Sequence, residues 1–174
     1  MAGILFFALA LLACPYPLAL ILALSLHEGA HLMAALILQK ELPLITFSLT
    51  GARLSYRPCQ NTFSALTVSL SGSFFGMIFA FLLWRYKAFS LCSMGLSLVN
   101  LLPVSCLDGG GALQIILDRF CLPRKAYLIS RIASVLAVIL FWALSVAVQL
   151  KAGGNISLLC VSVYLTVYVL CEKG

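Results

Sequence analysis

The sequence predicts an all-α polytopic membrane protein of about six transmembrane helices, with a short membrane-associated β-hairpin or loop after the second. Of its 174 residues 63% are hydrophobic and only 9% are charged, against about 45–50% and about 25% in soluble domains. The apolar runs are continuous, whereas the strands of a membrane β-barrel alternate in polarity. We expect a single domain, residues 1–174, lying in the lipid bilayer.

The first apolar stretch, residues 2–38, is too long for one crossing of a hydrocarbon core about 30 Å thick. Pro15 and Pro17 divide it, so we expect a short span over about 2–14 and a second over about 17–39, with Pro17 in the first helical turn. The first is predicted to be a retained span and not a signal peptide, because it lacks a basic segment.

Residues 42–61 differ in character from the spans. β-Branched and aromatic residues precede Thr50 and Gly51, and a second short run ends at Pro58. This pattern indicates a small hairpin or re-entrant β-loop over about 44–56, and it fits an irregular loop equally well.

Four further spans are predicted, over about 62–84, from 88 toward Pro103, over about 126–150 and over about 155–171. The fourth is interrupted, because Pro103 and the glycines at 109–111 predict a helix broken at membrane depth. Such backbone is tolerated only where protein or a wet cavity covers it.

The charged residues predict the membrane topology and speak against nucleic-acid binding, and the cysteines speak against a disulfide-rich fold. If the chain crosses the membrane six times, eight of the 11 lysines and arginines lie on the same side as the N-terminus. The excess of positive charge on that side predicts that both termini are cytoplasmic. The basic residues that make up the net charge of +6 stand singly or in small groups, which predicts loop anchoring and no nucleic acid partner. The seven cysteines form no CxxC pair and predict no disulfide framework.

Three polar residues interrupt the second span: His27, Glu28 and His31, spaced as HExxH. His27 lies about 15 Å along this helix, close to the membrane midplane. Residues i and i+4 share a helix face, so the two imidazoles can hold one metal ion, with Glu28 placed to reach a water bound to it. A zinc site of this kind needs one more protein ligand. The alternative is a pair of histidines that hydrogen-bond across a bundle, with Glu28 paired to an arginine.

Asp108 is the candidate for the missing ligand, because it is the other acidic residue predicted to lie deep in the membrane. It stands at the break in the fourth span, where a short side chain can point inward. The glycines at 109–111 would permit the turn and the close approach of another helix. The alternative is an aspartate that caps a helix beginning near Gly110.

These two motifs carry a resemblance to a known family. The HEGAH of the second span, followed by NLLPVSCLDGG at Asn100–Gly110, resembles the site-2 protease family of intramembrane zinc metalloproteases. The family's NxxPxxxLDG signature is matched by Asn100, Pro103, Leu107, Asp108 and Gly109. The resemblance covers about residues 17–120, which would be the catalytic core, and the six-span plan looks most like the subgroup that contains the stage IV sporulation protease.

The sequence also departs from the family pattern. Ser71-Gly72-Ser73 is the nearest match to the family's small-Gly-Pro sequence and lacks the proline. We expect neither a PDZ-like insertion nor the nucleotide-binding regulatory domain of the sporulation subgroup.

The resemblance implies an activity and a role for each site residue. The chain would be a zinc metalloendopeptidase that hydrolyses peptide bonds in or near transmembrane segments, as in regulated intramembrane proteolysis. His27, His31 and Asp108 would bind zinc, and Glu28 would be the general base. Asn100 would steady the substrate or the developing oxyanion. The expected partners are a membrane-embedded protein substrate, the lipids of the cell membrane and a membrane regulatory protein.

Proteolysis at this depth also needs water and an unwound substrate. The loop around Gly51 would correspond to the family's membrane-associated β-element, and a strand edge there would hold the peptide by main-chain hydrogen bonds. Arg53, Arg57 and the serines near 69–73 are candidates for the mouth of a water channel.

Three other functions stay open. The first is a membrane metalloprotease class whose third ligand is a glutamate, a role for which Glu172 at the end of the chain is poorly placed. The second is a membrane metal carrier or channel, which would need a polar path that the last two spans hardly provide. The third is a catalytically silent relative that acts as a partner-binding protein, against which the intact Glu28 speaks.

Overall fold

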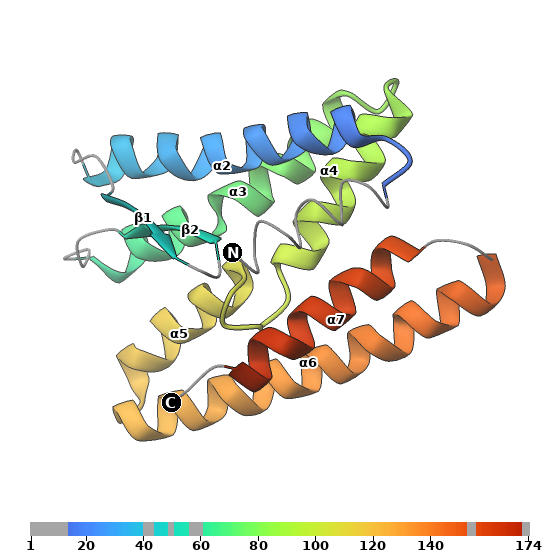
Figure 1. Cartoon of the computed structure of the whole chain (residues 1–174). Coiled ribbons are helices and arrows are strands. Elements are labelled where there is room, and N and C mark those ends of the chain that lie inside the picture. The colour runs from blue at the N-terminus through green and yellow to red at the C-terminus, as the bar shows by residue number, and fades with distance from the viewer. Residues whose placement is uncertain (1–13, 40–43, 49–50, 56–60, 153–155, 172–174) are drawn as a thin grey trace.

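The computed structural model describes residues 14–39, 44–48, 51–55, 61–152 and 156–171. These residues form six helices and two short strands (Figure 1). In chain order they are α2 (Pro17–Gln39), β1 (Leu44–Ser48), β2 (Gly51–Ser55), α3 (Thr62–Leu82), α4 (Lys87–Asn100), α5 (Asp108–Phe120), α6 (Pro123–Ala152) and α7 (Ile156–Cys171).

Three of the described helices are long and apolar enough to cross a membrane: Pro17–Leu38, Thr62–Leu82 and Pro123–Lys151. Each also exposes large apolar side chains, for example Leu18, Phe81 and Leu140. Exposed apolar surface on this scale is unfavourable in water and is what a lipid environment accommodates. The described fold is therefore mainly helical, and three of its helices have the length and composition of membrane-spanning helices.

The expected number of about six spans is not found among the described residues. The predicted fourth span is instead α4, with 14 residues, and α5, with 13, separated by the segment 101–107. A helix of 14 residues reaches about 21 Å, which is less than a hydrocarbon core of about 30 Å. α7 has 16 residues and is also short. The expected span over 2–14 lies, apart from Cys14, outside the described residues.

Local chemistry accounts for where the long helices begin. α2 starts at Pro17, a position where the absent N–H costs no hydrogen bond. α3 starts after Asn61, whose side-chain oxygen accepts a hydrogen bond from the Phe63 N–H at 3.1 Å. The helix break predicted near Pro103 is present, because α4 ends at Asn100 and the next helix begins at Asp108.

The two strands lie in the segment 44–56. They pair antiparallel, with Leu44 opposite Ser55 and Ser48 opposite Gly51. Residues 49–50, which join the strands, lie outside the described residues.

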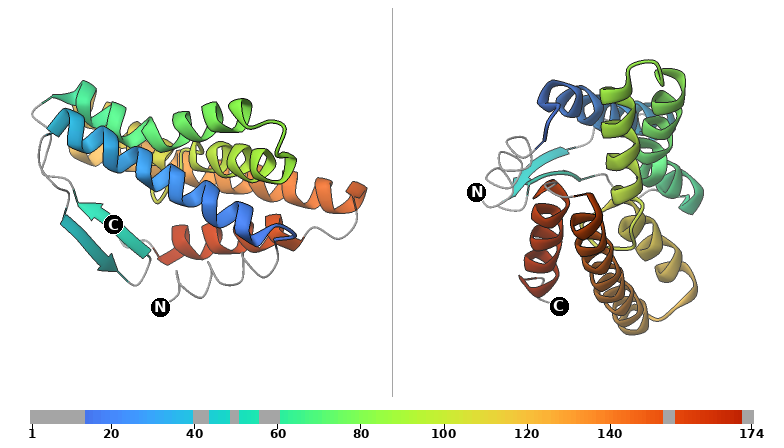
Figure 2. Two further views of the ribbon diagram at one scale, coloured as in Figure 1. Left: turned by 90° about the horizontal axis from the view of Figure 1, so that it is seen from above. Right: turned by 90° about the vertical axis from the view of Figure 1, so that its right-hand side faces the viewer.

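The helices form two parts (Figures 1 and 2). In the site bundle, α2 to α5, helix α3 contacts each of the other three helices. In the C-terminal helix pair, α6 and α7 pack side by side, and α6 also contacts α5. The apolar core lies between this pair and the segment after α4, and consists of Val104, Ala137, Val138, Phe141, Leu165, Tyr168 and Val169.

Candidate metal centre

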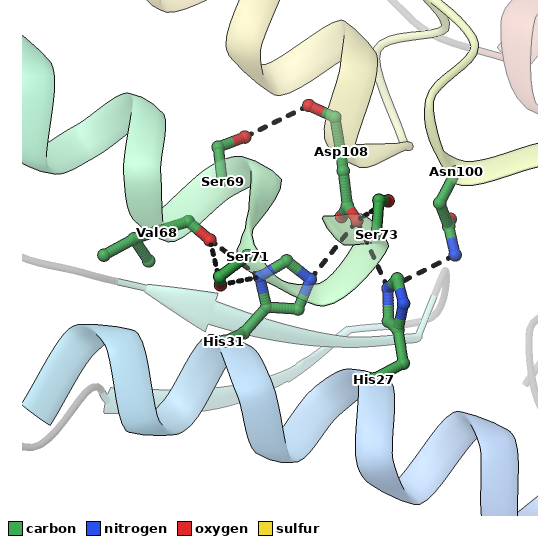
Figure 3. Close-up of polar contacts among 8 residues, drawn as sticks. All are labelled: His27, His31, Val68, Ser69, Ser71, Ser73, Asn100 and Asp108. Carbon is green, nitrogen blue, oxygen red and sulfur yellow. Dashed lines mark hydrogen bonds and ion pairs between the residues drawn. The ribbon is translucent and has the colours of Figure 1, made fainter. Parts of the chain in front are cut away.

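Helix α2 presents both histidines of the HExxH motif to the interior of the site bundle. His27 and His31 are buried, and their ring centroids lie 5.0 Å apart (Figure 3). α3 passes close to them at Gly72, where an added Cβ would lie 2.8 Å from Nε2 of His27 and closer still to the imidazole of His31. The absence of a side chain at Gly72 therefore makes room for the two rings.

Asp108 brings a carboxylate to the same point from α5. Its Oδ2 atom lies 3.2 Å from Nε2 of His27 and 3.3 Å from Nε2 of His31. Asp108 is the first residue of α5, and the N-cap position belongs to Leu107. The capping alternative is thus not what the structure shows. His27, His31 and Asp108 each offer one ligand atom, all within 4.8 Å of one another, and this group could hold a metal ion.

The donor set and its spacing fit zinc. Nitrogen and oxygen ligands at about 2.0–2.2 Å from a tetrahedral ion lie about 3.3 Å from each other, which matches the 3.2 and 3.3 Å separations of Asp108 Oδ2 from the two imidazole nitrogens. The Nδ1 atom of His31 lies 2.7 Å from the Val68 carbonyl oxygen. A carbonyl only accepts hydrogen bonds, so Nδ1 carries the proton and a neutral His31 directs its Nε2 lone pair at Asp108. Nitrogen and carboxylate lone pairs at this distance repel each other unless a proton or a cation lies between them.

Three serines on one stretch of α3 contact the site (Figure 3). Ser73 Oγ donates to Asp108 Oδ2 at 2.8 Å, and Ser69 Oγ donates to the main-chain oxygen of Asp108 at 3.1 Å. Ser71 Oγ donates to the Val68 carbonyl at 2.8 Å and lies 3.3 Å from Nδ1 of His31. We expected these serines near a channel mouth, but Ser71 and Ser73 are buried beside the ligands.

The other two predicted site residues occupy different environments. Asn100, the last residue of α4, places its Nδ2 atom 3.3 Å from Nε2 of His27. Glu28 follows His27 on α2 and its side chain is exposed. The structure therefore joins His27, His31, Asp108 and Asn100 by direct contacts and leaves Glu28 on the open side of the same helix. Of the predicted channel residues, Arg57 lies outside the described residues.

The segment 101–107 sets the positions of Asn100 and Asp108. Val104 is fully buried in the apolar core, and Ser134 Oγ of α6 lies 3.1 Å from the Pro103 carbonyl and 3.3 Å from the Ser105 N–H. These contacts tie the segment to α6. The site therefore depends on a helix that contributes no ligand of its own.

The glycines after Asp108 allow this segment to fold closely over the start of α5. A Cβ at Gly109 would lie 2.7 Å from the Leu102 carbonyl oxygen, and one at Gly110 would lie 2.7 Å from the Ser105 nitrogen. We expected these glycines to permit the turn and the close approach of another helix, and Gly109 and Gly110 serve the turn. At Gly111 the neighbour is α3, where Ser69 Oγ would lie 3.1 Å from an added Cβ.

In comparisons with known proteins, no family model, curated protein or solved structure matches this chain. Sequence reasoning assigned no role in the site to Gly72 and placed Ser69, Ser71 and Ser73 at a channel mouth and not against the ligands. Their signal was the alternation of serines at 69, 71 and 73, with Gly72 between the last two, in a largely apolar helix.

Proposed function

We propose that the chain is an intramembrane zinc metalloprotease that hydrolyses peptide bonds in or near transmembrane segments of other membrane proteins. One observation carries the proposal: the two histidines of an HExxH motif and an aspartate from another helix converge with ligand atoms 3.2 and 3.3 Å apart. The resemblance of both motifs to the site-2 protease family supports the same activity.

His27, His31 and Asp108 are the proposed zinc ligands. A bound zinc ion supplies the Lewis acid that activates water and polarises a peptide carbonyl. Glu28 is the proposed general base, which accepts a proton from the attacking water and returns it to the leaving amine. The HExxH spacing supports this role, because it places Glu28 directly after a proposed zinc ligand on the same helix.

Asn100 is proposed to donate a hydrogen bond to the oxygen on which charge develops during the attack. A fixed amide donor at that place stabilises the transition state more than the substrate. Its Nδ2 atom, 3.3 Å from Nε2 of His27, stands at the edge of the ligand group and not among the ligands.

We further propose that the protein is a multi-pass protein of the cell membrane with both termini in the cytoplasm. The three long apolar helices support membrane insertion. The orientation rests on the six-span plan, in which eight of the 11 lysines and arginines fall on the side of the N-terminus. In this arrangement β1 and β2 would lie at the membrane and offer an edge to an unwound substrate. Proline at Thr46 or Leu54 would then reduce cleavage, because each removes a main-chain donor.

The test compares the wild-type protein with Glu28→Gln and His27→Ala, each purified in detergent and analysed for metal. The three are then reconstituted with a panel of single-span reporter proteins, and products are identified by mass spectrometry. We expect one zinc ion per wild-type chain, cleavage by the wild type alone, and full zinc content in Glu28→Gln.

Two results would overturn the proposal. Cleavage by Glu28→Gln at the wild-type rate would remove Glu28 as the base, and a wild type free of metal would remove the zinc centre. Zinc in the wild type without cleavage of any reporter would favour a silent relative that binds a membrane partner.

A further inference from the structure

Oδ2 of Asp108 is the atom on which the candidate centre converges. It lies 3.2 and 3.3 Å from the two imidazole nitrogens, and it also accepts the hydrogen bond of Ser73 Oγ at 2.8 Å. A carboxylate oxygen has two lone-pair sites. The hydroxyl of Ser73 occupies one of these sites, which leaves the other free to bind a metal ion held by the two histidines (Figure 3).

The hydroxyl of Ser73 donates to a side-chain carboxylate and not to a main-chain carbonyl of its own helix. Ser25, Thr67 and Ser162 donate to the carbonyl four residues earlier in their own helix, which is the usual local solution. Ser73 is 0% exposed and instead donates to a side chain 35 positions away in the sequence. Its neighbour Gly72 brings this part of α3 against both imidazoles.

We infer that Ser73 is a positioning residue for the metal centre, which holds the Asp108 carboxylate so that one of its oxygens is directed at the two histidines. The inference rests on the zinc site proposed above. The Asp108 side chain turns about two bonds. The buried hydroxyl of Ser73 restricts both rotations, because turning the carboxylate away would break a 2.8 Å hydrogen bond.

Two serines of the same bundle provide matched controls for Ser73→Ala. Ser69 donates to Asp108 as well, but to its main-chain oxygen, so Ser69→Ala removes a bond without releasing the ligand atom. Ser97 on α4 is also 0% exposed, and its Oγ has no hydrogen-bond partner in the part of the chain that the structure describes. Ser97→Ala therefore makes the same change in packing and removes no bond.

The experiment uses the full chain in detergent and measures zinc affinity by competition with a chromogenic chelator. Cobalt(II) is then loaded in place of zinc, because its visible absorption reports the number and arrangement of ligands. We expect Ser73→Ala to weaken zinc binding by about 10- to 100-fold, the usual effect of removing a hydrogen bond to a ligand. Its cobalt spectrum should change, Ser97→Ala should stay within about twofold of the wild type, and Ser69→Ala should fall between them.

Ser73→Thr tests whether the hydroxyl itself is needed. Ser73→Thr keeps the hydroxyl and should restore the wild-type cobalt spectrum, which a purely structural role would not require. Equal affinities for Ser73→Ala and Ser97→Ala, whether both intact or both weakened, would overturn the role of Ser73 and leave the centre standing. A wild type that binds neither zinc nor cobalt would instead remove the centre itself.

Discussion

The site bundle and the C-terminal helix pair both bury polar side chains, but they arrange them differently. In the site bundle, polar atoms from α2, α3, α4 and α5 converge on one point, Oδ2 of Asp108 and the imidazoles beside it. In the C-terminal helix pair they form separate contacts along the seam. Ser145 and Ser162 lie 2.8 Å apart, and Trp142 Nε1 donates to Thr166 at 2.7 Å.

This difference separates two uses of polar residues in an apolar protein. Isolated hydroxyl pairs satisfy each other and hold two helices together at a modest gain, averaging about 0.6 kcal/mol per contact. Converging ionisable groups are costly to bury and persist where a partner or a function compensates for the cost. The site bundle therefore holds the candidate centre, and the C-terminal helix pair contacts it through Val104 and Ser134.

The largest effect on stability is expected in the C-terminal helix pair. Leu165 is 1% exposed in the apolar core, so Leu165→Ala should lower the free energy of unfolding by about 3 kcal/mol through the cavity it leaves. Zinc affinity of the folded protein should stay unchanged. Unfolding in mixed micelles with increasing SDS measures the first quantity, and chelator competition measures the second.

Leu170→Ala is the control, since Leu170 lies on the same helix with 77% of its surface exposed. A loss of zinc affinity in Leu165→Ala under folding conditions would mean that the two parts are not separable in this way.

Gly72→Ala should break the centre with one methyl group. The new Cβ would overlap both imidazoles, and relieving the overlap should cost about 2 kcal/mol, or roughly 30-fold in zinc affinity. Gly29→Ala and Gly95→Ala are the controls, because an added Cβ at either position meets nothing within 4 Å. Wild-type affinity in Gly72→Ala would show that α3 can withdraw without disturbing the histidines.

Ser134→Ala tests the link between the two parts. Its hydroxyl contacts both the Pro103 carbonyl and the Ser105 N–H, so its removal should destabilise the protein by about 1 kcal/mol. It should also weaken zinc binding, though less than Ser73→Ala, because Asp108 follows the loosened segment. Titration with zinc before and after the substitution measures this, and an unaltered affinity would disprove the link.

Ser145→Ala should have the smallest effect. It removes the hydroxyl pair with Ser162 and should cost about 0.6 kcal/mol, with zinc affinity and cobalt spectrum both unchanged. It is the matched partner of Ser134→Ala, since both replace a buried serine of α6. A change in the cobalt spectrum would show that the contact between α6 and α7 affects the candidate centre.

Much of the candidate centre could be predicted from the sequence, because its signals are local. The i and i+4 spacing of His27 and His31 fixes their shared face in any α-helix. Asp108 stood out as an acidic residue beside a predicted helix break, and the structure brings its carboxylate to both imidazoles. The same local reasoning placed the start of α2 at Pro17.

The lengths of the helices were harder to predict. The break in the fourth span was predicted from Pro103 and the glycines, but not that α4 and α5 are each too short to cross a membrane alone. The ends at Asn100 and Asp108 depend on the loop between them, which is held by contacts with α6.

The sequence by itself determined that the chain is apolar and helical and that two histidines share one helix face. Composition and spacing along a single helix decide both, since neither depends on what the helix packs against. Only the tertiary structure decided that Gly72 faces the imidazoles and that Ser73 donates to Asp108. Which small residue of α3 meets α2 and α5 depends on how the helices pack across one another, and packing between distant segments is set by the whole bundle.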